Sequence, residues 1–562
     1  MNSDGLIIAR RIDYWRASTF LIAALAALPV VAILYLALFP EENIWPHLLS
    51  TSLPRYVANT VILMSGVGIS IFFTGVTTAY LVTSYEFPLR GAFEWLLLLP
   101  LAIPAYVIAY LYTDLLEFAG PVQHSLRELF GWKLANDYWF PEVRSMGGGI
   151  MLMGLVLYPY VYLMARSAFL EQSKYLLEVS RLLGRGPLQT FVHVSLPIAR
   201  PAIAVGVALA LMETLNDFGT VDFFAIQTLT AGLYDVWLGM GNLGGAAQIA
   251  GVMLTFVIVL ISLEYVGRRH RKFYQSARRF HSTERASLTG VYRWIAFGLC
   301  ALPVTAGFMI PLALLVKHTV NYFHISWTPE FERYALNSFM LSAGAATIAV
   351  TLATVIAYSR RLASGRVLLL ASRLASLGYA VPGAVLAIGV IIPFAVFDNA
   401  LDALARNYLG FSTGLVLSGT VFALIFAYVV RFMAVSIGSV ESSFSKVSES
   451  MDMAARTLGH SAFSTLKKFH LPLLKGGILT AALVVFVDCM KELPATLILR
   501  PFNFETLATH VYQFASDEMI EESALGSLVI VLTGLIPVII LSRTITASRE
   551  LPRLDEGPDH SV

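Results

Sequence analysis

The sequence predicts an all-α membrane protein with twelve transmembrane helices. Of its 562 residues, 57% are hydrophobic and only 14% are charged, and the mean hydropathy is +0.70. Because a soluble globular protein carries about 25% charged residues, a chain this poor in charge cannot cover a water-facing surface. A spanning helix needs roughly 20 mostly apolar residues. Twelve such stretches are expected, at 18–39, 57–83, 92–113, 147–166, 198–218, 246–265, 293–316, 337–358, 371–396, 413–433, 476–493 and 524–542.

Lys and Arg residues concentrate in alternate loops of this arrangement. They cluster before the first helix, between helices eight and nine, after the last helix and, most densely, at 266–290. Short loops rich in Lys and Arg stay in the cytoplasm, so both termini are expected there. The first apolar run has no small-residue cleavage site and is interpreted as a retained helix. The two cysteines, Cys300 and Cys489, lie in apolar runs and do not indicate a disulfide framework.

The sequence also repeats itself at an offset of 278 residues. The recurring motifs are Arg55-Tyr56-x-x-Asn59 with Arg333-Tyr334-x-x-Asn337, and Ala102-x-Pro104-x-x-Val107-x-Ala109 with Ala380-x-Pro382-x-x-Val385-x-Ala387. Six spans per half give the halves parallel topology and a pseudo-two-fold axis along the membrane normal. We therefore expect a first domain at 1–265, a basic cytoplasmic linker at 266–290 and a second domain at 291–562. Pro104 and Pro382 are expected to break helices three and nine at equivalent places.

Each half carries a polar, amphipathic insertion between its fourth and fifth helices. Gly184 precedes Pro197, and Gly459 precedes Pro472, by the same 13 positions. We expect a short helix, a turn that glycine permits, a second short helix, and a proline that begins the next span. The apolar residues expected on the two resulting knobs are Leu182, Leu183 and Phe191, and Leu458, Phe463 and Leu466. Two knobs with matched spacing favour docking into a partner protein, whereas the alternative is a plain connector on the membrane surface.

The insertions resemble the EAA loop of ABC importer permeases, Glu-Ala-Ala-x3-Gly-x9-Ile-x-Leu-Pro. The resemblance implies ATPase-coupling roles for Glu178, Arg181, Leu182, Gly184, Leu196 and Pro197, and for Ala454, Ala455, Arg456, Gly459, Leu471 and Pro472. In the first copy Val179-Ser180 replace the alanine pair, and in the second Met453 replaces the glutamate. An acidic contact to the ATPase is therefore expected only in the first half.

The whole chain is similar to the fused ferric-iron importer permeases, most tellingly at 213–222 and 491–501. The resemblance implies two fused six-helix type I importer repeats in the bacterial inner membrane. It also implies two ATPase subunits as partners and a periplasmic or lipoprotein solute-binding protein. Other ABC cargoes remain open: thiamine, polyamine, an oxyanion or another small solute. Two other classes also remain, a 6+6 secondary transporter and a membrane scaffold.

Charged residues follow the short apolar runs of the fifth and eleventh helices. They are Glu213 and Asp217 in the first half, and Asp488, Lys491 and Glu492 in the second. A spacing of four places each acidic pair on one helix face. Because a charge inside a span is costly unless it faces water or the bundle interior, we expect these residues to line the translocation pathway at its outer mouth. The alternative is that they hydrate helix ends or pair with neighbours.

Several motifs of catalysis and cofactor binding are missing from the sequence. The chain has no Gly-x4-Gly-Lys-Ser/Thr loop, so ATP and Mg are expected on the partner ATPase and no cofactor on this chain. It also has no Cys/His metal cluster and no nucleophile triad, which indicates a non-catalytic subunit. No nucleic-acid partner is expected. Whether the carboxylates hold a metal is left open.

Overall fold

The computed structural model describes residues 3–547 except 41, 173, 270–284 and 364. Among these residues, eleven helices are long and apolar enough to cross a membrane, and a helix pair bent by 90° makes a twelfth if it is one span. The expectation of an all-helical protein with twelve spans is confirmed on that count. Its division at 265 and 290 stays a prediction, and most of the linker lies outside the described residues.

The spans of the two halves follow one another in the same order. In the first half they are α1 (Ser3–Leu38), α3 (Leu53–Ser84), the bent pair of α4 (Arg90–Leu96) and η1 (Leu99–Ala102) with α5 (Ala105–Leu116), then α7 (Met146–Leu170), α10 (Leu196–Asn216) and α13 (Leu243–Arg269). In the second half they are α14 (Val291–Val304) with η5 (Thr305–Met309) and α15 (Ile310–Ser326), then α16 (Pro329–Leu362), α18 (Gly383–Leu409), α19 (Val421–Phe444), α22 (Leu471–Met490) and α25 (Ile520–Ala547).

Shorter elements connect these spans. They are α2 (Trp45–Ser50), α6 (Pro121–Phe130), η2 (Ala135–Asp137), α8 (Lys174–Leu182), α9 (Pro187–Thr190), η3 (Phe191–Ser195), α11 (Gly219–Phe223), α12 (Leu229–Tyr234), η4 (Asp235–Gly239), α17 (Arg366–Ala375), η6 (Leu377–Ala380), α20 (Glu449–Thr457), α21 (Ala462–Thr465), η7 (Leu466–His470), α23 (Pro494–Leu499) and α24 (Leu507–Ser516). Two short strands, β1 (Tyr85–Glu86) and β2 (Ala286–Ser287), pair in parallel.

The two prolines of the repeated motif break the chain as expected. A 3₁₀ turn ends before each, at Ala102 and at Ala380, and each proline is extended, with φ near −60° and ψ near 143°. The next helix therefore starts after the proline. The ninth span was expected at 371–396 and instead covers Gly383–Leu409, because Pro382 ends the preceding turn.

The other repeated motif makes the same contacts in both halves. Asn59 Nδ2 donates to the Gln227 carbonyl, and Asn337 Nδ2 donates to the Glu505 carbonyl, each at 3.0 Å. One residue further along, a hydroxyl accepts from the backbone of the segment that follows, Thr60 from Leu229 N and Ser338 from Leu507 N. These contacts tie the second span of each half to its outer connector, and the sequence repeat is thus a structural repeat.

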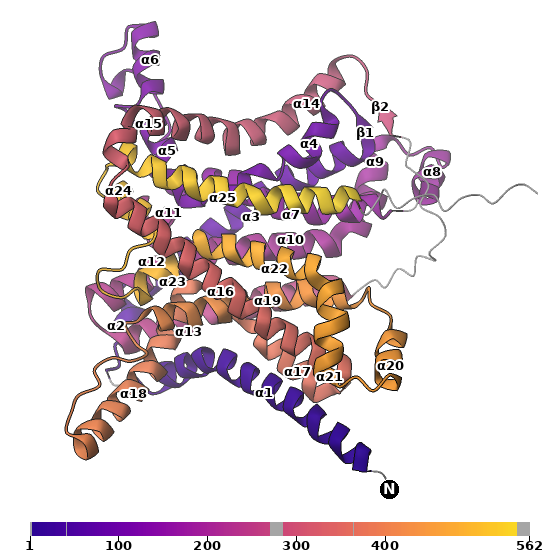
Figure 1. The fold of residues 1–562 in the computed structure, drawn as a ribbon. Helices are drawn as coiled ribbons and strands as arrows, with labels where there is room; N and C mark the ends of the chain where they lie inside the picture. Colours follow the sequence, from indigo (N-terminus) through magenta and orange to yellow (C-terminus); the bar gives the residue numbers. More distant parts are fainter. Residues whose placement is uncertain (1–2, 41, 173, 270–284, 364, 548–562) are drawn as a thin grey trace, which may run out of the picture.

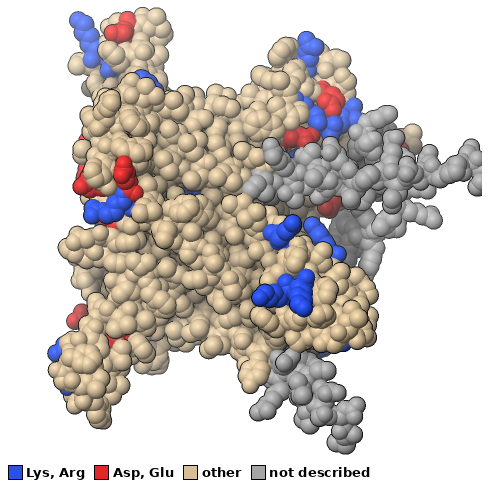
Figure 2. Space-filling view, viewed as in Figure 1, with Lys and Arg blue, Asp and Glu red and all other residues tan. Residues whose placement is uncertain are grey.

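The polar elements lie at the two ends of the bundle. In Figure 1, α8, α20 and the start of α1 lie at one end, whereas α2, α6, α12 and α24 lie at the other. Figure 2 shows charged side chains gathered at these ends, with an almost uncharged belt between them. A belt of this kind is what a lipid-facing surface requires.

Candidate functional site

The two insertions form matching turns at one end of the bundle. Gly184 and Gly459 have φ of +78° and +79°, the left-handed region that favours glycine. The backbone N–H that follows each glycine reaches back five residues, from Arg185 to Ser180 O at 3.2 Å and from His460 to Ala455 O at 3.0 Å. This 6→1 bond ends a helix in the Schellman manner. The predicted glycine turn is confirmed in both copies.

Pro197 and Pro472 lie in the first turn of α10 and α22, as predicted, but the helical segment that contains each of them begins earlier. Each short helix after the turn runs without a break into the span, giving apolar helices over Pro187–Asn216 and Ala462–Met490. A π-helical turn lies ahead of each proline, and the N–H of Leu196 and of Leu471 bonds to the carbonyl five residues earlier. Such a widened turn absorbs local strain inside a helix, here beside a proline that donates no hydrogen bond. Each turn is therefore attached to a continuous rod.

The knobs expose apolar side chains in equivalent places. Leu183 and Leu458 are about three-quarters exposed, and Leu188 and Phe463 are 74% and 64% exposed. Leu182 is 86% exposed. Isolated apolar side chains are common on surfaces, but the same positions in two copies indicate a contact surface.

Two residues expected on the knobs face inward instead. Phe191 is half-buried, with its ring 4.4 Å from that of Tyr80 and 6.3 Å from that of Phe169. Leu466, its equivalent in the second half, is 6% exposed. Both residues lie in the π turn, where their side chains point to the bundle. They therefore pack the knobs against the bundle and are not part of the exposed surface of the knobs.

The other predicted coupling residues differ in exposure. Glu178, Gly184, Ala454, Arg456, Gly459 and Pro472 are exposed, Leu196, Pro197 and Leu471 are half-buried, and Ala455 is buried. The side chain of Arg181 lies outside the described residues. Met453 is 62% exposed, so the second knob presents an apolar side chain where the first presents the carboxylate of Glu178.

Arg361, at the end of α16, holds the second knob. Its Nε lies 2.6 Å from Asp452 Oδ2, and its terminal nitrogens donate to the carbonyls of Phe444 and Val447, each at 2.9 Å. On the other side, His470 Nε2 lies 2.6 Å from Asp452 Oδ1. In the sequence, Arg361 is one member of the basic cluster between helices eight and nine, and nothing there predicts this role. In the described part of the first knob, the hydroxyls of Ser180 and Thr190 lie 3.0 Å apart and join its two short helices.

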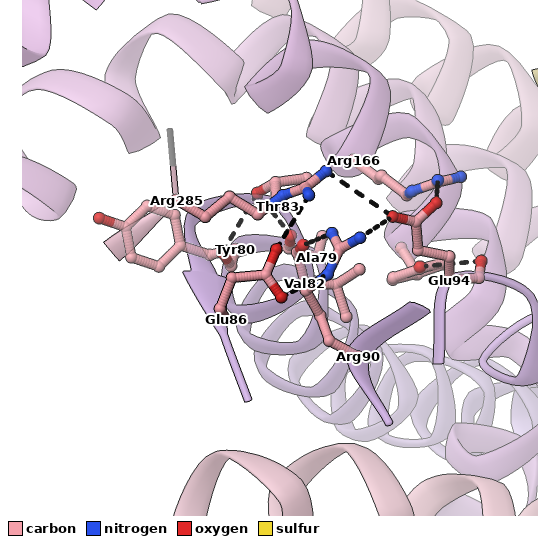
Figure 3. A network of polar contacts seen from close by, with 10 residues as sticks. Ala79, Tyr80, Val82, Thr83, Glu86, Arg90, Glu94, Arg166 and Arg285 are labelled. Carbon is pink, nitrogen blue, oxygen red and sulfur yellow. Dashed lines mark hydrogen bonds and ion pairs between the residues drawn. The ribbon is translucent and has the colours of Figure 1, made fainter. Parts of the chain in front are cut away.

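The end of the predicted linker is attached beside the first knob. Figure 3 shows three guanidinium groups gathered around Glu86 and Glu94. Arg285 lies 3.0 Å from Glu86, while Arg90 and Arg166 lie 2.7 Å and 2.6 Å from Glu94. Strand β2 extends this attachment by pairing with β1. The described end of the linker is thus fixed to the first half.

The far ends of the two rods meet at a cavity in the middle of the bundle. Four of the five predicted pathway residues line it, namely Glu213, Asp217, Lys491 and Glu492. Pro104 lines it too, so the break in the third span opens onto this space. Asp488 is not among the lining residues, and its Oδ1 lies 3.0 Å from Lys491 Nζ. The structure therefore brings the predicted residues together, and their part in translocation stays a prediction.

Two of the carboxylates bind backbone groups of short helices. Asp217 Oδ1 accepts from the N–H groups of Thr220 and Val221, at 2.9 and 3.3 Å, at the start of α11. Glu492 Oε1 accepts from Ala495 N at 3.2 Å at the start of α23. Carboxylates favour helix N-termini because the free N–H groups there need acceptors. Glu492 is only 6% exposed, and the expectation that these residues lie at the outer mouth of the pathway stays a prediction.

Arg431, from the middle of α19, was missed in the sequence. It is 5% exposed, and its Nε lies 3.4 Å from Glu492 Oε2. Its Nη1 donates to Asn216 Oδ1 at 3.1 Å, which also accepts from Gly383 N at 2.6 Å. Because Asn216 belongs to the first half and Arg431 to the second, this network joins the halves. The one available signal was a single arginine in an apolar run.

No group of three His, Cys, Asp or Glu side chains that could hold a metal ion occurs in the part of the chain that the structure describes. The bundle thus combines a repeated architecture, continuous helices that end in exposed knobs, and a cavity lined by charged side chains. Residues 71–272 match the family of binding-protein-dependent transport system inner membrane components. Over these residues the chain is similar to such inner-membrane permeases.

Proteins of known sequence extend the match to nearly the whole chain. The Fe(3+)-transport system permease protein FbpB 2 of Haemophilus influenzae is 25% identical over 87% of this chain and 89% of its own length. The ferric transport system permease protein FbpB of Actinobacillus pleuropneumoniae is 21% identical over 89% and 72%. The molybdenum transport system permease protein ModB of Escherichia coli is 27% identical over 35% of this chain and 86% of its own length. This relative is matched over most of its own length but over only about a third of this chain, as expected if this chain contains two permease copies and the relative contains one.

Proposed function

We propose that this chain is the membrane-spanning subunit of an ATP-driven importer of ferric iron in the bacterial inner membrane. The observation that carries the proposal is the continuity of each knob with a rod that ends at the central cavity. Thirty residues of helix span roughly 45 Å, which is enough to cross the membrane. A push on either knob is therefore delivered to the cavity.

The knobs dock two copies of a separate ATPase, one on each. Both knobs and the start of α1 lie at the same end of the bundle, which we take as the cytoplasmic end because the basic loops are there. ATP and Mg bind the ATPase, and this chain hydrolyses nothing. When ATP closes the ATPase dimer, the knobs approach one another and the halves rock to open outward; hydrolysis resets them. A solute-binding protein delivers the cargo at the opposite end.

Ferric iron is the proposed cargo because relatives similar over most of this chain carry that name. The carboxylates of the cavity support a cation, since they outnumber its lysine. A secondary transporter of 6+6 build has no use for paired knobs joined to the cavity by rods. Thiamine and polyamine remain the competing cargoes within the importer class.

Site-specific cross-linking tests the docking role. Cys300 and Cys489 are buried, so a cysteine introduced at Leu183 or Leu458 can be labelled selectively. Leu129→Cys is the matched control, because Leu129 is 76% exposed on α6 at the opposite end. We expect both knob cysteines, and not the control, to cross-link to the ATPase subunit. Failure of both, or equal cross-linking at Leu129, overturns the assignment.

Vesicle transport tests the cargo. Proteoliposomes that hold this chain with its ATPase subunits, supplied with the solute-binding protein, should import radiolabelled ferric iron when ATP is present. Import of labelled thiamine with no import of iron would show that thiamine, and not ferric iron, is the cargo. The docking role of the knobs would be unaffected.

A further inference from the structure

The carboxylates around the central cavity differ in what they already bind. Asp217 and Glu492 accept hydrogen bonds from helix N-termini, and Asp488 pairs with Lys491. Glu213 lines the cavity and has no direct hydrogen bond or ion pair within 4 Å among the described residues, although the charges of Arg431 and Lys491 act on it from further away. It lies in the last turn of α10, so it stands at the cavity end of the first rod. Of these carboxylates, Glu213 is the one free to bind something that enters the cavity.

A buried tyrosine hydroxyl at the cavity also lacks a hydrogen-bond partner. Tyr106 lines the cavity, is only 4% exposed, and its hydroxyl has no hydrogen-bond partner. A buried polar group without a partner destabilises the fold unless a ligand or water satisfies it. Its ring is held against Gly219, where an added Cβ would lie 2.7 Å from the Tyr106 Cβ. A second phenol, that of Tyr160, also lines the cavity, as Glu213 does.

The charge of the cavity selects for a cation. Its ionisable lining consists of three carboxylates and one lysine, a formal charge of −2. An anionic chelate would meet this charge without enough donors to offset it, whereas a small cation gains from it. Carboxylate and hydroxyl oxygens are the ligands that hard cations prefer. The lining is thus suited in both sign and donor type to a hard cation.

We propose that this cavity is a transit site for a small hard cation, held by the carboxylate of Glu213 with the hydroxyl oxygens of Tyr106 and Tyr160. The proposal rests on the proposed function and deepens it: the cargo crosses as a cation that has left any anionic chelator behind. One free carboxylate with neutral phenols binds weakly, as passage requires, because a conducting site must also release its ion.

The structure offers a matched pair of variants. Tyr106 and Tyr110 lie one turn apart on α5, both are buried, and both hydroxyls lack a partner. Only Tyr106 lines the cavity. Tyr106→Phe and Tyr110→Phe therefore each remove one buried orphaned hydroxyl, and only the first removes it from the proposed site. Glu213→Gln removes the charge with little change of shape, and Glu213→Asp keeps it.

The experiment measures radiolabelled ferric iron imported per ATP hydrolysed, in proteoliposomes that hold the complete complex with its binding protein. We expect Glu213→Gln to lower this ratio about tenfold, the equivalent of one charged hydrogen bond. Glu213→Asp should stay within about twofold of the wild type, Tyr106→Phe should fall about threefold, and Tyr110→Phe should match the wild type.

Each other outcome points to a distinct failure. The transit site is overturned if the wild-type complex imports iron and Glu213→Gln has the same ratio of iron imported to ATP hydrolysed. It is also overturned if Tyr106→Phe and Tyr110→Phe lower this ratio equally. A wild-type complex that hydrolyses ATP and imports no ferric iron overturns the cargo of the proposed function instead.

Discussion

Replacing Arg431 by methionine should destabilise the protein by about 3 kcal/mol. The side chains of Arg431 and Glu492 are each 6% exposed, and they form the ion pair at the junction of the two halves. Removing one partner of a buried pair typically costs about 3–5 kcal/mol, because the other charge is left without compensation. The Asn216 amide oxygen keeps its bond from Gly383 N, so most of the loss comes from Glu492. The lower end of the range is therefore expected.

A double-mutant cycle isolates this pair. Arg431→Met combined with Glu492→Gln removes both charges, and the glutamine carbonyl can still accept from Ala495 N. We expect the double variant to lose only about 1 kcal/mol, a coupling of at least about 2 kcal/mol between the two sites. The assay is reversible unfolding of the purified chain in mixed micelles, followed by circular dichroism. Losses that add within about 0.5 kcal/mol would refute the reasoning, because independent sites behave that way.

Three other variants test separate parts of the structure. Gly184→Pro and Gly459→Pro together should abolish co-purification of the ATPase without preventing membrane insertion, because proline cannot adopt the φ of +78° or +79° at these turns; co-purification at wild-type levels would contradict this. Asp217→Asn with Glu492→Gln should lower iron uptake per assembled complex several-fold, since amides still accept from the helix N-termini while the cavity loses two charges; unchanged uptake per assembled complex counts against a pathway role. His510 lies on α24 with a pKa lowered to about 4 by burial, so its neutral form stabilises the fold, and stability is lost as pH falls from about 6.5 toward 4. The thermal midpoint of His510→Gln should fall less than that of the wild type over this range, and parallel curves would exclude the effect.

The local features of the site were predictable from the sequence. The glycine turns and the proline breaks depend on the backbone preferences of single residues, which act in any context. The four-residue spacing of the acids was equally visible, but the prediction that each pair shares a helix face is wrong, because α10 ends at Asn216 and α22 at Met490, before Asp217 and Glu492. The continuous rods were not foreseen, because a proline near a helix start usually marks its first turn, and a π turn has no simple signature.

The two arginines that organise the site depend on contacts distant in the sequence. Arg431 bonds to Asn216, 215 residues away, and Arg361 bonds to Asp452, 91 residues away. No periodicity connects such partners, so only the folded chain reveals them. The inward turn of Phe191 and Leu466 has the same origin, because the path of the π turn decides which side chains reach the bundle.

The most direct test is uptake by vesicles that hold the purified chain alone, compared with vesicles that also hold the ATPase subunits and ATP. The account predicts import only in the second case, and its loss when Gly184 and Gly459 are both replaced by proline. Import by the chain alone at the full rate, driven by an ion gradient, would contradict it.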